Sequence, residues 1–597
     1  MAYYFLRCSV LLILGLLVYG QTFHFGFVFD DQYFIVNNPF IRNFNHVPMM
    51  WHVFPITRLV GMYSFALNYY FNQLHPQGYH IFNFIVHLTA TGLVWALASL
   101  LFKITKVLPA KDRLTQELPF IIAVLFLIHP GQTQAVTYIT QRFESMATVF
   151  YLSTVYFYLR ARLSTGMTRR IILFGLAASS AILGVMTKEV IVTVPVMILA
   201  SEWILFPQKN NKVLYAAIVF CAVLLVAVLS KMLHAGINIF LQTGFPSESH
   251  DSDILTPAHY VLTQMRVFLT FLRLLVLPIH QNLDYDYPAS SGFFHPPLTL
   301  AGLLVISGII HLIVKLRRRN PLIAFGLAWI FITFSINLAP RSNVIFEHKL
   351  YLISFGFFLS AVSAFFVVVR NSKTLLKIFC CLIAVLAFIS YQRNKVWANE
   401  LVLWEDIIKK SPDKARVNAS LGRVYGSMGR YDDSVHYLSR ALAIKPDNIT
   451  YENRGIIYSQ QGRFDLALED LNKSIAMDPT YFNTYIKRSW VFQSEHRYQE
   501  ALADLAHVIQ LEPYFADAYI ERGLLWISIG HAQDALDDFK QALKIEPYNY
   551  QVLQKRGELY YALGQYGLAL DDFTKVLTLE PASTEAAQYR SLCLKKL

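Results

Sequence analysis

The sequence predicts an all-α protein in two parts, a polytopic membrane domain followed by a helical-repeat solenoid. The chain has 597 residues, of which 55% are hydrophobic and only 15% are charged, which is too apolar for an ordinary soluble protein. Long uncharged runs recur up to about Tyr391, and after Arg393 the composition is that of a soluble helical protein. Prolines then recur at a nearly constant interval. We therefore expect a membrane domain over 1–391 and a repeat domain over 392–597.

Eleven apolar runs are long enough to be considered as membrane-spanning helices. A span needs about 20 apolar residues, because the hydrocarbon core is about 30 Å thick and a helix rises 1.5 Å per residue. The first run has no clear small-x-small cleavage site, so we expect it to be retained as a span. The third and fourth runs are short and predict a tilted or re-entrant pair around His129 and Pro130. The candidates begin near residues 4, 79, 118, 143, 171, 190, 213, 297, 321, 349 and 375.

The segment from 259 to 279 is apolar but carries Arg266 and Arg273, which lie on one face of a helix. We interpret it as an amphipathic helix at the membrane interface. With this segment excluded, the basic clusters between spans fall on one side, which the positive-inside rule makes cytoplasmic. The net charge of +12 is therefore explained by basic loops on the cytoplasmic side of the membrane, and we expect no nucleic-acid partner.

The same topology brings a set of charged residues to the external face of the membrane. Charged groups at membrane level are costly and are usually paired or functional, so the set predicts a shared site. Neighbours in sequence, Arg142 with Glu144 and Lys188 with Glu189, are equally well explained as structural ion pairs. The full set is Asp30, Asp31, Arg142, Glu144, Lys188, Glu189, Glu347, His348 and Lys349.

The second part of the chain repeats with a period of 33 or 34 residues. Prolines stand at 412, 446, 479, 513, 547 and 581, and small residues stand in register at 422, 455, 489, 523 and 557. This pattern resembles the tetratricopeptide repeat, in which small residues let two helices approach closely. We expect five repeats and a final capping helix.

A repeat solenoid leaves a concave groove that suits extended peptides. Four arginines recur at 34-residue spacing and predict a polar stripe for the backbone or carboxylates of a protein acceptor. The alternative is a face that is solvated or paired within its own helix. The four are Arg454, Arg488, Arg522 and Arg556.

The stretch "FVFDDQYF" places Asp30 and Asp31 among aromatics, directly after the first span. A carboxylate facing basic residues at the membrane surface suits sugar transfer from a polyprenyl phosphate. Such transfer needs a base for the acceptor hydroxyl and cations for the departing phosphate. Adjacent aspartates also commonly cap a helix or a turn, which is the structural alternative.

Six motifs occur in one order and together resemble the transmembrane and tetratricopeptide-repeat (TMTC) proteins and their bacterial relatives. The resemblance covers nearly the whole chain and implies a GT-C fold with O-mannosyl transfer from a dolichyl-phosphate sugar to Ser or Thr outside the cytoplasm. It makes the aspartate pair the acidic motif of the first external loop. Gln134 and "TRL" at 57–59 depart from the usual family pattern, and the variant is typical of bacterial members. The motifs are "FDDQYFIVNNPFI", "RLVGMYSFALNYYFNQLHPQGYHIFNFIVHL", "HPGQTQAVTYITQRFESMA", "TKEVIVTVPVMI", "QNLDYDYP" and "VIFEHKLYLISFGF".

The leading hypothesis is an inverting glycosyltransferase that moves a sugar, by default mannose, from a polyprenyl phosphate to a protein hydroxyl. Inversion follows if attack is a single displacement, since no separate nucleophile and acid pair is visible. Asp30 is the expected base and Asp31 orients it or the acceptor. For donor phosphate we expect Arg142, Lys188, His348 and Lys349, and for support Arg58, Glu144, Glu189 and Glu347.

Two rival hypotheses remain at this stage. One is a non-catalytic scaffold that anchors a repeat array, and the other is a transferase for glycan or lipid acceptors. The lipid-linked donor is the one cofactor-like molecule that we expect, and a divalent metal stays open as an alternative. Asp284 and Asp286 could bind such a metal, but two carboxylates by themselves do not make a site. The expected location is the bacterial inner membrane with periplasmic repeats, or else the endoplasmic reticulum membrane with lumenal repeats.

Overall fold

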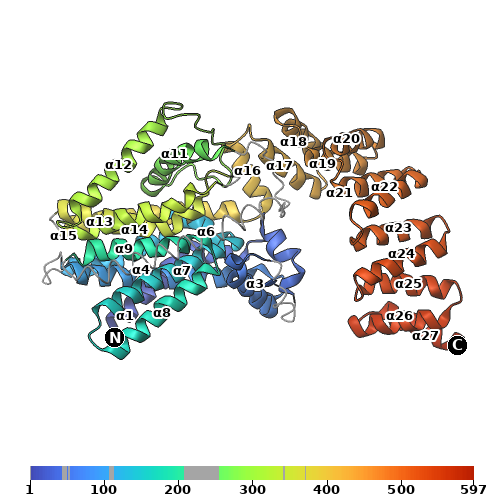
Figure 1. Ribbon diagram of the computed structural model, residues 1–597, viewed down its shortest axis with the longest axis horizontal. Coiled ribbons are helices and arrows are strands. Elements are labelled where there is room, and N and C mark those ends of the chain that lie inside the picture. Colours follow the sequence, from blue (N-terminus) through green and yellow to red (C-terminus); the bar gives the residue numbers. More distant parts are fainter. Residues whose placement is uncertain are drawn as a thin grey trace. The chain divides into compact units, whose positions relative to one another are not determined.

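The computed structural model describes residues 2–42, 50–51, 54–106, 113–207, 255–340, 343–369 and 372–597. The chain divides into two compact units, Met1–Pro412 and Asp413–Leu597 (Figure 1). Throughout the described residues the regular structure is helical, with no strand, as the sequence predicts. The division falls later than the expected 391/392, because η11 (Lys395–Trp397) and α16 (Glu400–Lys410) pack within the first unit.

Seven helices of the described first unit are long and apolar enough to cross a membrane, or eight if one bent pair counts as a span. Two of the eleven expected spans are helices that fail this test: α9 (Val194–Leu205) has only 12 residues, and α7 (Arg142–Leu163) is not apolar enough. The expected span near 213 lies outside the described residues. The seven are α1 (Ala2–Tyr19), α4 (Pro76–Thr105), α8 (Met167–Val185), α12 (Leu298–Leu316), α13 (Pro321–Phe334), α14 (Leu350–Val368) and α15 (Ser372–Asn394).

The bent pair consists of α5 (Arg113–Ile128) and α6 (Thr133–Thr137), which meet at an angle of 56°. The break falls at His129 and Pro130, where the sequence predicts it, but α6 rather than α7 is the second member. His129 Nδ1 accepts from the Gly131 N–H at 3.1 Å, and Nε2 lies 3.2 Å from the Leu275 carbonyl. The histidine is thus a satisfied residue of the kink, as expected.

Helix α11 (Pro257–Val276) is the segment that we interpret as interfacial. It is not among the candidate spans, but its arginines do not share a lipid-facing surface. Arg266 is buried and donates to the Pro288 carbonyl at 2.8 Å, while Arg273 donates to the Ile279 carbonyl at 3.0 Å. The arginines therefore bind neighbouring loop carbonyls, which the one-face argument did not foresee.

Five of the charged residues predicted for the site lie on short helices that join the spans: Arg58, Glu189, Glu347, His348 and Lys349. The connecting elements are short, apart from one longer helix. They are η1 (Gly20–His24), η2 (Gln32–Val36), η3 (Pro39–Ile41), η5 (Ile56–Arg58), α3 (Leu59–Asn72), η6 (Pro130–Gln132), η7 (Ile139–Gln141), η8 (Glu189–Thr193), η9 (Ser335–Leu338) and η10 (Glu347–Lys349).

The second unit contains five helix pairs and a last single helix. Close approach explains the small residues: a Cβ on Gly422 would lie 2.7 Å from Leu438, and one on Gly523 would lie 2.7 Å from Phe539. The pairs are α17 (Ala415–Ser427) with α18 (Tyr431–Ile444), α19 (Asn448–Gln460) with α20 (Phe464–Met477), α21 (Phe482–Ser494) with α22 (Tyr498–Leu511), α23 (Ala516–Ser528) with α24 (Ala532–Ile545) and α25 (Tyr550–Ala562) with α26 (Tyr566–Leu579), followed by α27 (Thr584–Lys596).

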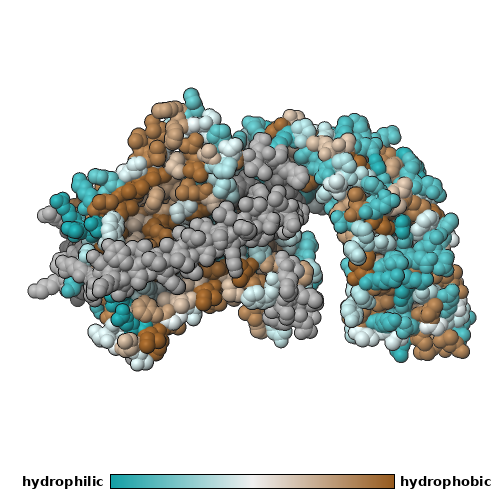
Figure 2. All heavy atoms as spheres, viewed as in Figure 1, coloured by the Kyte–Doolittle hydropathy of each residue, from teal (hydrophilic) through white to brown (hydrophobic). Residues whose placement is uncertain are grey.

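The two units expose different surfaces. Figure 2 shows hydrophobic side chains gathered over the helices of the first unit, whereas hydrophilic side chains dominate the repeats. On helix α12, for example, the side chains of Leu298, Leu304 and Val314 are each more than half exposed. Such apolar exposure would be unfavourable in water and suits contact with lipid, so the first unit is a multi-pass membrane domain.

Gly523→Val should destabilise the repeat unit by a few kcal/mol, since the added side chain overlaps the Phe539 ring in a packed helix pair. Gly567→Ala is the matched control, because a Cβ there meets nothing within 4 Å. Limited proteolysis of the repeats during a temperature ramp measures both. Equal protease resistance in the two variants would contradict the close-packing role of Gly523.

Candidate active site

Asp31 is fully buried and ties the first external loop to η7. Its carboxylate accepts hydrogen bonds from the Val28 N–H at 3.0 Å, the Thr140 N–H at 2.8 Å and the Thr140 hydroxyl. Burial raises the pKa of Asp31 to about 7, although these three hydrogen bonds act to lower it. Asp31 therefore serves as an anchor for the loop and has no surface on which to meet a substrate.

Asp30 differs from its neighbour because it is only half-buried. Its backbone N–H donates to the Tyr138 hydroxyl at 3.0 Å, and the same hydroxyl is hydrogen-bonded to the Asp30 carboxylate. Burial, together with the two nearby carboxylates, raises the pKa of Tyr138 far above its usual value, so the phenol stays a donor. The structure thus divides the pair into a partly accessible carboxylate, Asp30, and a buried anchor, Asp31.

Two ion pairs bring four of the predicted site residues together across different elements. Lys188 Nζ lies 2.9 Å from Glu144 Oε2, and Arg58 lies 3.0 Å from Glu189 Oε1. The pairs expected from sequence neighbours, Arg142 with Glu144 and Lys188 with Glu189, are wrong. On a helix, the side chains of residues one or two positions apart do not face each other. Glu144 and Glu189 are therefore paired with cations from other elements.

Residues of these ion pairs form part of the wall of a small pocket, with a volume of about 20 Å³. This volume is far below the range of about 300–1,000 Å³ that is usual for ligand sites and is enough for about one water molecule. The walls come from α7, η8, α13, η9, η10 and α14. The lining residues are Glu144, Lys188, Glu189, Val190, Thr333, Ile336, Lys349 and Leu352. Two cations and two carboxylates from the predicted site therefore share one cavity.

Adjacent residues of η7 connect this pocket to the acidic loop. Thr140 donates to Asp31, and Gln141 accepts from Lys188 Nζ at 3.4 Å. The next residue, Arg142, opens α7, whose first turn carries Glu144 into the pocket. The turn η7 thus contacts both the aspartate pair and the pocket lined by Lys188 and Lys349, which we call the lysine pocket. Such a connection is expected if the two belong to one site.

Arg142 itself is fully buried and does not line the pocket. It donates to Asn83 Oδ1 at 2.7 Å, to the Ser64 carbonyl and hydroxyl at 3.2 Å, and to the Tyr79 carbonyl at 3.1 Å. Its guanidinium also lies 4.3 Å from the centre of the Phe82 ring. With its donors bound to protein, Arg142 has the surroundings of a structural cation that joins α3, α4 and α7, so we withdraw it as a donor-phosphate residue.

The three consecutive residues of η10 point to different neighbours. Glu347 is buried and accepts from the Asn282 N–H at 2.6 Å, from Gln281 Nε2 at 3.0 Å and from the Tyr285 hydroxyl. The His348 N–H donates to Gln134 Oε1 at 2.6 Å, while Lys349 lines the pocket. Glu347 therefore binds the 281–285 loop, and Lys349 is the residue of this turn that lines the pocket.

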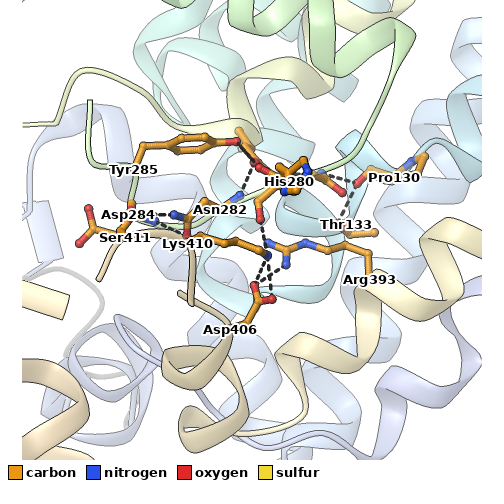
Figure 3. A network of polar contacts seen from close by, with 12 residues as sticks. Pro130, Thr133, His280, Asn282, Asp284, Tyr285, Arg393, Asp406, Lys410 and Ser411 are labelled. Atoms are coloured by element: carbon orange, nitrogen blue, oxygen red, sulfur yellow. Dashed lines mark hydrogen bonds and ion pairs between the residues drawn. The ribbon is translucent and has the colours of Figure 1, made fainter. Parts of the chain in front are cut away.

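Figure 3 shows how the loop that receives Glu347 is fixed from its other side. Asp406 lies between two cations, 2.7 Å from Arg393 and 2.5 Å from Lys410, and Lys410 also donates to the Gln281 carbonyl at 2.7 Å. The Asn282 side chain donates to the Ser411 hydroxyl at 2.9 Å. Helix α16, the residue after it and the end of α15 therefore hold the 281–285 loop, which also binds Glu347.

The four arginines that recur at 34-residue spacing in the repeats are bound by aspartates of the same repeats. Each arginine binds the aspartate sixteen residues later, on the second helix of its own repeat, with Nε and a terminal nitrogen on the two carboxylate oxygens. The four aspartates are at least nine-tenths buried. The pairs join two helices, which neither the acceptor stripe nor pairing within one helix foresaw. Each arginine thus braces its repeat, and the four are withdrawn as acceptor-binding residues: Arg454, Arg488, Arg522 and Arg556.

Several residues of the site carry no signal in the sequence. Thr140 and Tyr138, which hold the two aspartates, lie in one of the six motifs, but no pattern there indicates their roles. These roles depend on tertiary contacts with residues more than a hundred positions away. Trp397 and Trp404 lie in the segment that the sequence assigns to the repeats, yet both are buried in the first unit. Two tryptophans seven residues apart are the one hint that this segment packs on something apolar.

The fold and the site define a class: a multi-pass helical membrane protein with a tetratricopeptide-repeat domain. Models of the tetratricopeptide repeat match residues 415–448, 449–481 and 550–583. Outside the repeats, the charged residues predicted for the site are concentrated at one end of the first unit, around a pocket.

Within this class the chain is similar to protein O-mannosyl-transferases of the TMTC type. It is 25% identical over 461 residues to protein O-mannosyl-transferase F38B6.6 of Caenorhabditis elegans, covering 73% of this chain and 62% of that protein. It is 23% identical over 495 residues to TMTC3 of Homo sapiens, covering 74% of this chain and 52% of that protein. The chain thus spans less than two thirds of the length of these relatives.

Two similar solved structures each cover less than a third of the chain. The crystal structure of MamA is 24% identical and covers 30% of this chain and 96% of that protein, with a TM-score of 0.26. That of YrrB, described as a tetratricopeptide-repeat protein with an unusual peptide-binding site, is 16% identical and covers 32% of this chain and 98% of that protein, with a TM-score of 0.26.

Asp31 should give the protein a characteristic pH dependence of stability. Its pKa rises from 3.8 to about 7 on folding, so between these values the folded state binds a proton that the unfolded state lacks. This contribution is complete below pH 3.8, persists through the acid range and is lost as the pH rises through 7. The apparent melting temperature in detergent should therefore rise from pH 8 to pH 6.

Asp31→Asn should remove this part of the pH dependence, whereas Asp286→Asn, at an exposed carboxylate, should leave it in place. Asp31→Asn should also lower stability by about 1–3 kcal/mol, because the new amide NH₂ would face the Val28 or Thr140 donors. An Asp31→Asn protein with the wild-type pH slope would contradict the buried, proton-binding role of Asp31.

Proposed function

We propose that the protein is a membrane glycosyltransferase that moves a sugar, by default mannose, from a polyprenyl phosphate to a hydroxyl of a protein acceptor. The observation that carries the proposal is the convergence of Lys188 and Lys349 in one pocket, joined through η7 to a partly accessible carboxylate. The names of the relatives, protein O-mannosyl-transferases, support the same reaction class. A plain membrane anchor would not require this arrangement of charge.

In the proposed reaction Asp30 is the general base. Its carboxylate takes the proton of a Ser or Thr hydroxyl while that oxygen attacks the anomeric carbon. The bond from the anomeric carbon to the phosphate oxygen breaks, and its electron pair leaves with the polyprenyl phosphate. A single displacement of this kind inverts the anomeric configuration. Asp31, buried beside the base, keeps the loop in place.

The lysine pocket is the proposed site for the donor phosphate. Lys188 and Lys349 come from different elements and would stabilise the negative charge that grows on the leaving phosphate. Burial lowers the pKa of Lys188 while Glu144 raises it, so the carboxylate helps to keep that lysine charged. The phosphate would be recognised by charge, which admits either a dolichyl or a bacterial polyprenyl carrier.

Asp30→Asn should reduce turnover by about 10²-fold or more, the usual contribution of a positioned base. The substitution keeps the size of the side chain, so donor affinity and thermal stability should change little. Release of sugar from dolichyl phosphate mannose to a Ser/Thr peptide measures turnover, and donor titration measures affinity.

Lys349→Met supplies the contrast, since loss of a cation from the pocket should weaken donor binding as well as turnover. Asp286→Asn is the matched control for replacing an exposed aspartate on the same external face. Near wild-type turnover in Asp30→Asn would remove the base assignment and would favour the scaffold alternative.

In the proposed topology, both the site and the repeats lie outside the cytoplasm. In a background with the native cysteines replaced by alanine, a cysteine at Thr480 should react with an impermeant maleimide added from outside. A cysteine at Arg318, in the basic cluster after α12, should react only after the membrane is opened; both residues are exposed. The reverse labelling would put the aspartates in the cytoplasm and refute this topology.

A further inference from the structure

Phe29, the residue before Asp30, has a backbone conformation that side-chain-bearing residues rarely adopt. Its φ angle is +51°, in the left-handed region, where the Cβ atom crowds the backbone. A conformation of this kind persists only when the surrounding structure holds it, and such residues concentrate at functional sites. The direction of the Asp30 side chain depends on this φ angle, because the two residues share a peptide bond.

Helix α16 and the turn before it supply the contacts that hold Phe29. The Phe29 N–H lies 3.3 Å from Glu400 Oε1, and the Gly26 N–H donates to the Ala398 carbonyl at 3.3 Å. The Phe29 ring meets the Trp404 ring edge-on, with centroids 5.6 Å apart and an interplanar angle of 78°. One carboxylate and one indole thus fix the backbone and the side chain of the strained residue.

The same segment also holds the phenol that binds Asp30. Trp397 stacks on Tyr138, with centroids 5.3 Å apart and an interplanar angle of 15°. The Tyr138 hydroxyl in turn contacts both the backbone N–H and the carboxylate of Asp30. Trp397 and Trp404 are both almost fully buried, so their positions are set by packing.

We propose that Trp397, Glu400 and Trp404 are positioning residues that aim the Asp30 carboxylate. The inference rests on the proposed function, in which Asp30 is the base. Loss of any of the three contacts lets Phe29 or Tyr138 relax and moves the carboxylate away from the acceptor hydroxyl. A displacement of about 1 Å in a reacting group can lower a rate by about 10²-fold.

The test uses the full-length protein in detergent, with dolichyl phosphate mannose and a Ser/Thr peptide as substrates. Glu400→Ala and Trp404→Ala should each lower kcat by about 10-fold or more and leave the donor KM unchanged. Glu400→Gln keeps an acceptor oxygen for the Phe29 N–H, and Trp404→Phe keeps an aromatic ring. These two conservative variants should therefore restore most of kcat.

Ile407→Ala is the matched control, because Ile407 is a fully buried residue of the same helix. It should lower the melting temperature as much as Trp404→Ala does, with little change in kcat. Equal kcat losses in Ile407→Ala and Trp404→Ala would show a general packing effect and would overturn the proposal.

A double-mutant cycle with Asp30→Asn separates this proposal from the function on which it rests. In the Asp30→Asn background, Glu400→Ala should lower kcat no further, since the group that it positions has lost its basicity. A slow Asp30→Asn enzyme in which Glu400→Ala still gives its full loss would overturn only the positioning proposal. Near wild-type activity of Asp30→Asn itself would overturn both.

Discussion

The first unit depends on one constraint, that each buried charge of the candidate site must be compensated by a partner. An uncompensated buried charge costs several kcal/mol, so the chain is arranged to supply the partners. Arg142 is satisfied by carbonyls and an amide of α3 and α4, and Asp31 by three donors of two loops. Because each set of partners comes from distant segments, satisfying the charges also fixes the loops that carry the proposed chemistry.

The same constraint explains which part of the structure the sequence predicts. The membrane unit, the kink at His129 and the five repeats follow from local patterns: apolar runs, a proline and a 34-residue period. The pairing of charges does not, because it depends on which helices meet. Lys188 binds Glu144 and not the adjacent Glu189, and the repeat arginines turn to aspartates sixteen residues away. The site residues could be gathered by motif, but their roles required the tertiary contacts.

Two adjacent aspartates illustrate how environment divides roles between chemically identical side chains. Asp31 is surrounded by donors and apolar atoms, and burial moves its pKa to about 7. Asp30, one residue earlier, stays half-buried with a phenol as partner. A pair of carboxylates in unlike surroundings is a common basis for assigning one to structure and the other to chemistry. From sequence, only the family resemblance separates the two.

Helix α16 shows why the boundary between the units matters for mechanism. It was expected to open the repeat domain, yet one set of its residues contacts the acidic loop and another binds the loop beneath Glu347. A base on an external loop needs a rigid support, since loops are otherwise mobile. Here the support is a short helix at the end of the membrane unit, anchored by Trp404 and by the Arg393–Asp406–Lys410 ion pairs. The geometry of the proposed base therefore depends on a helix that lies far later in the chain, with 371 positions between Phe29 and the Glu400 that holds it.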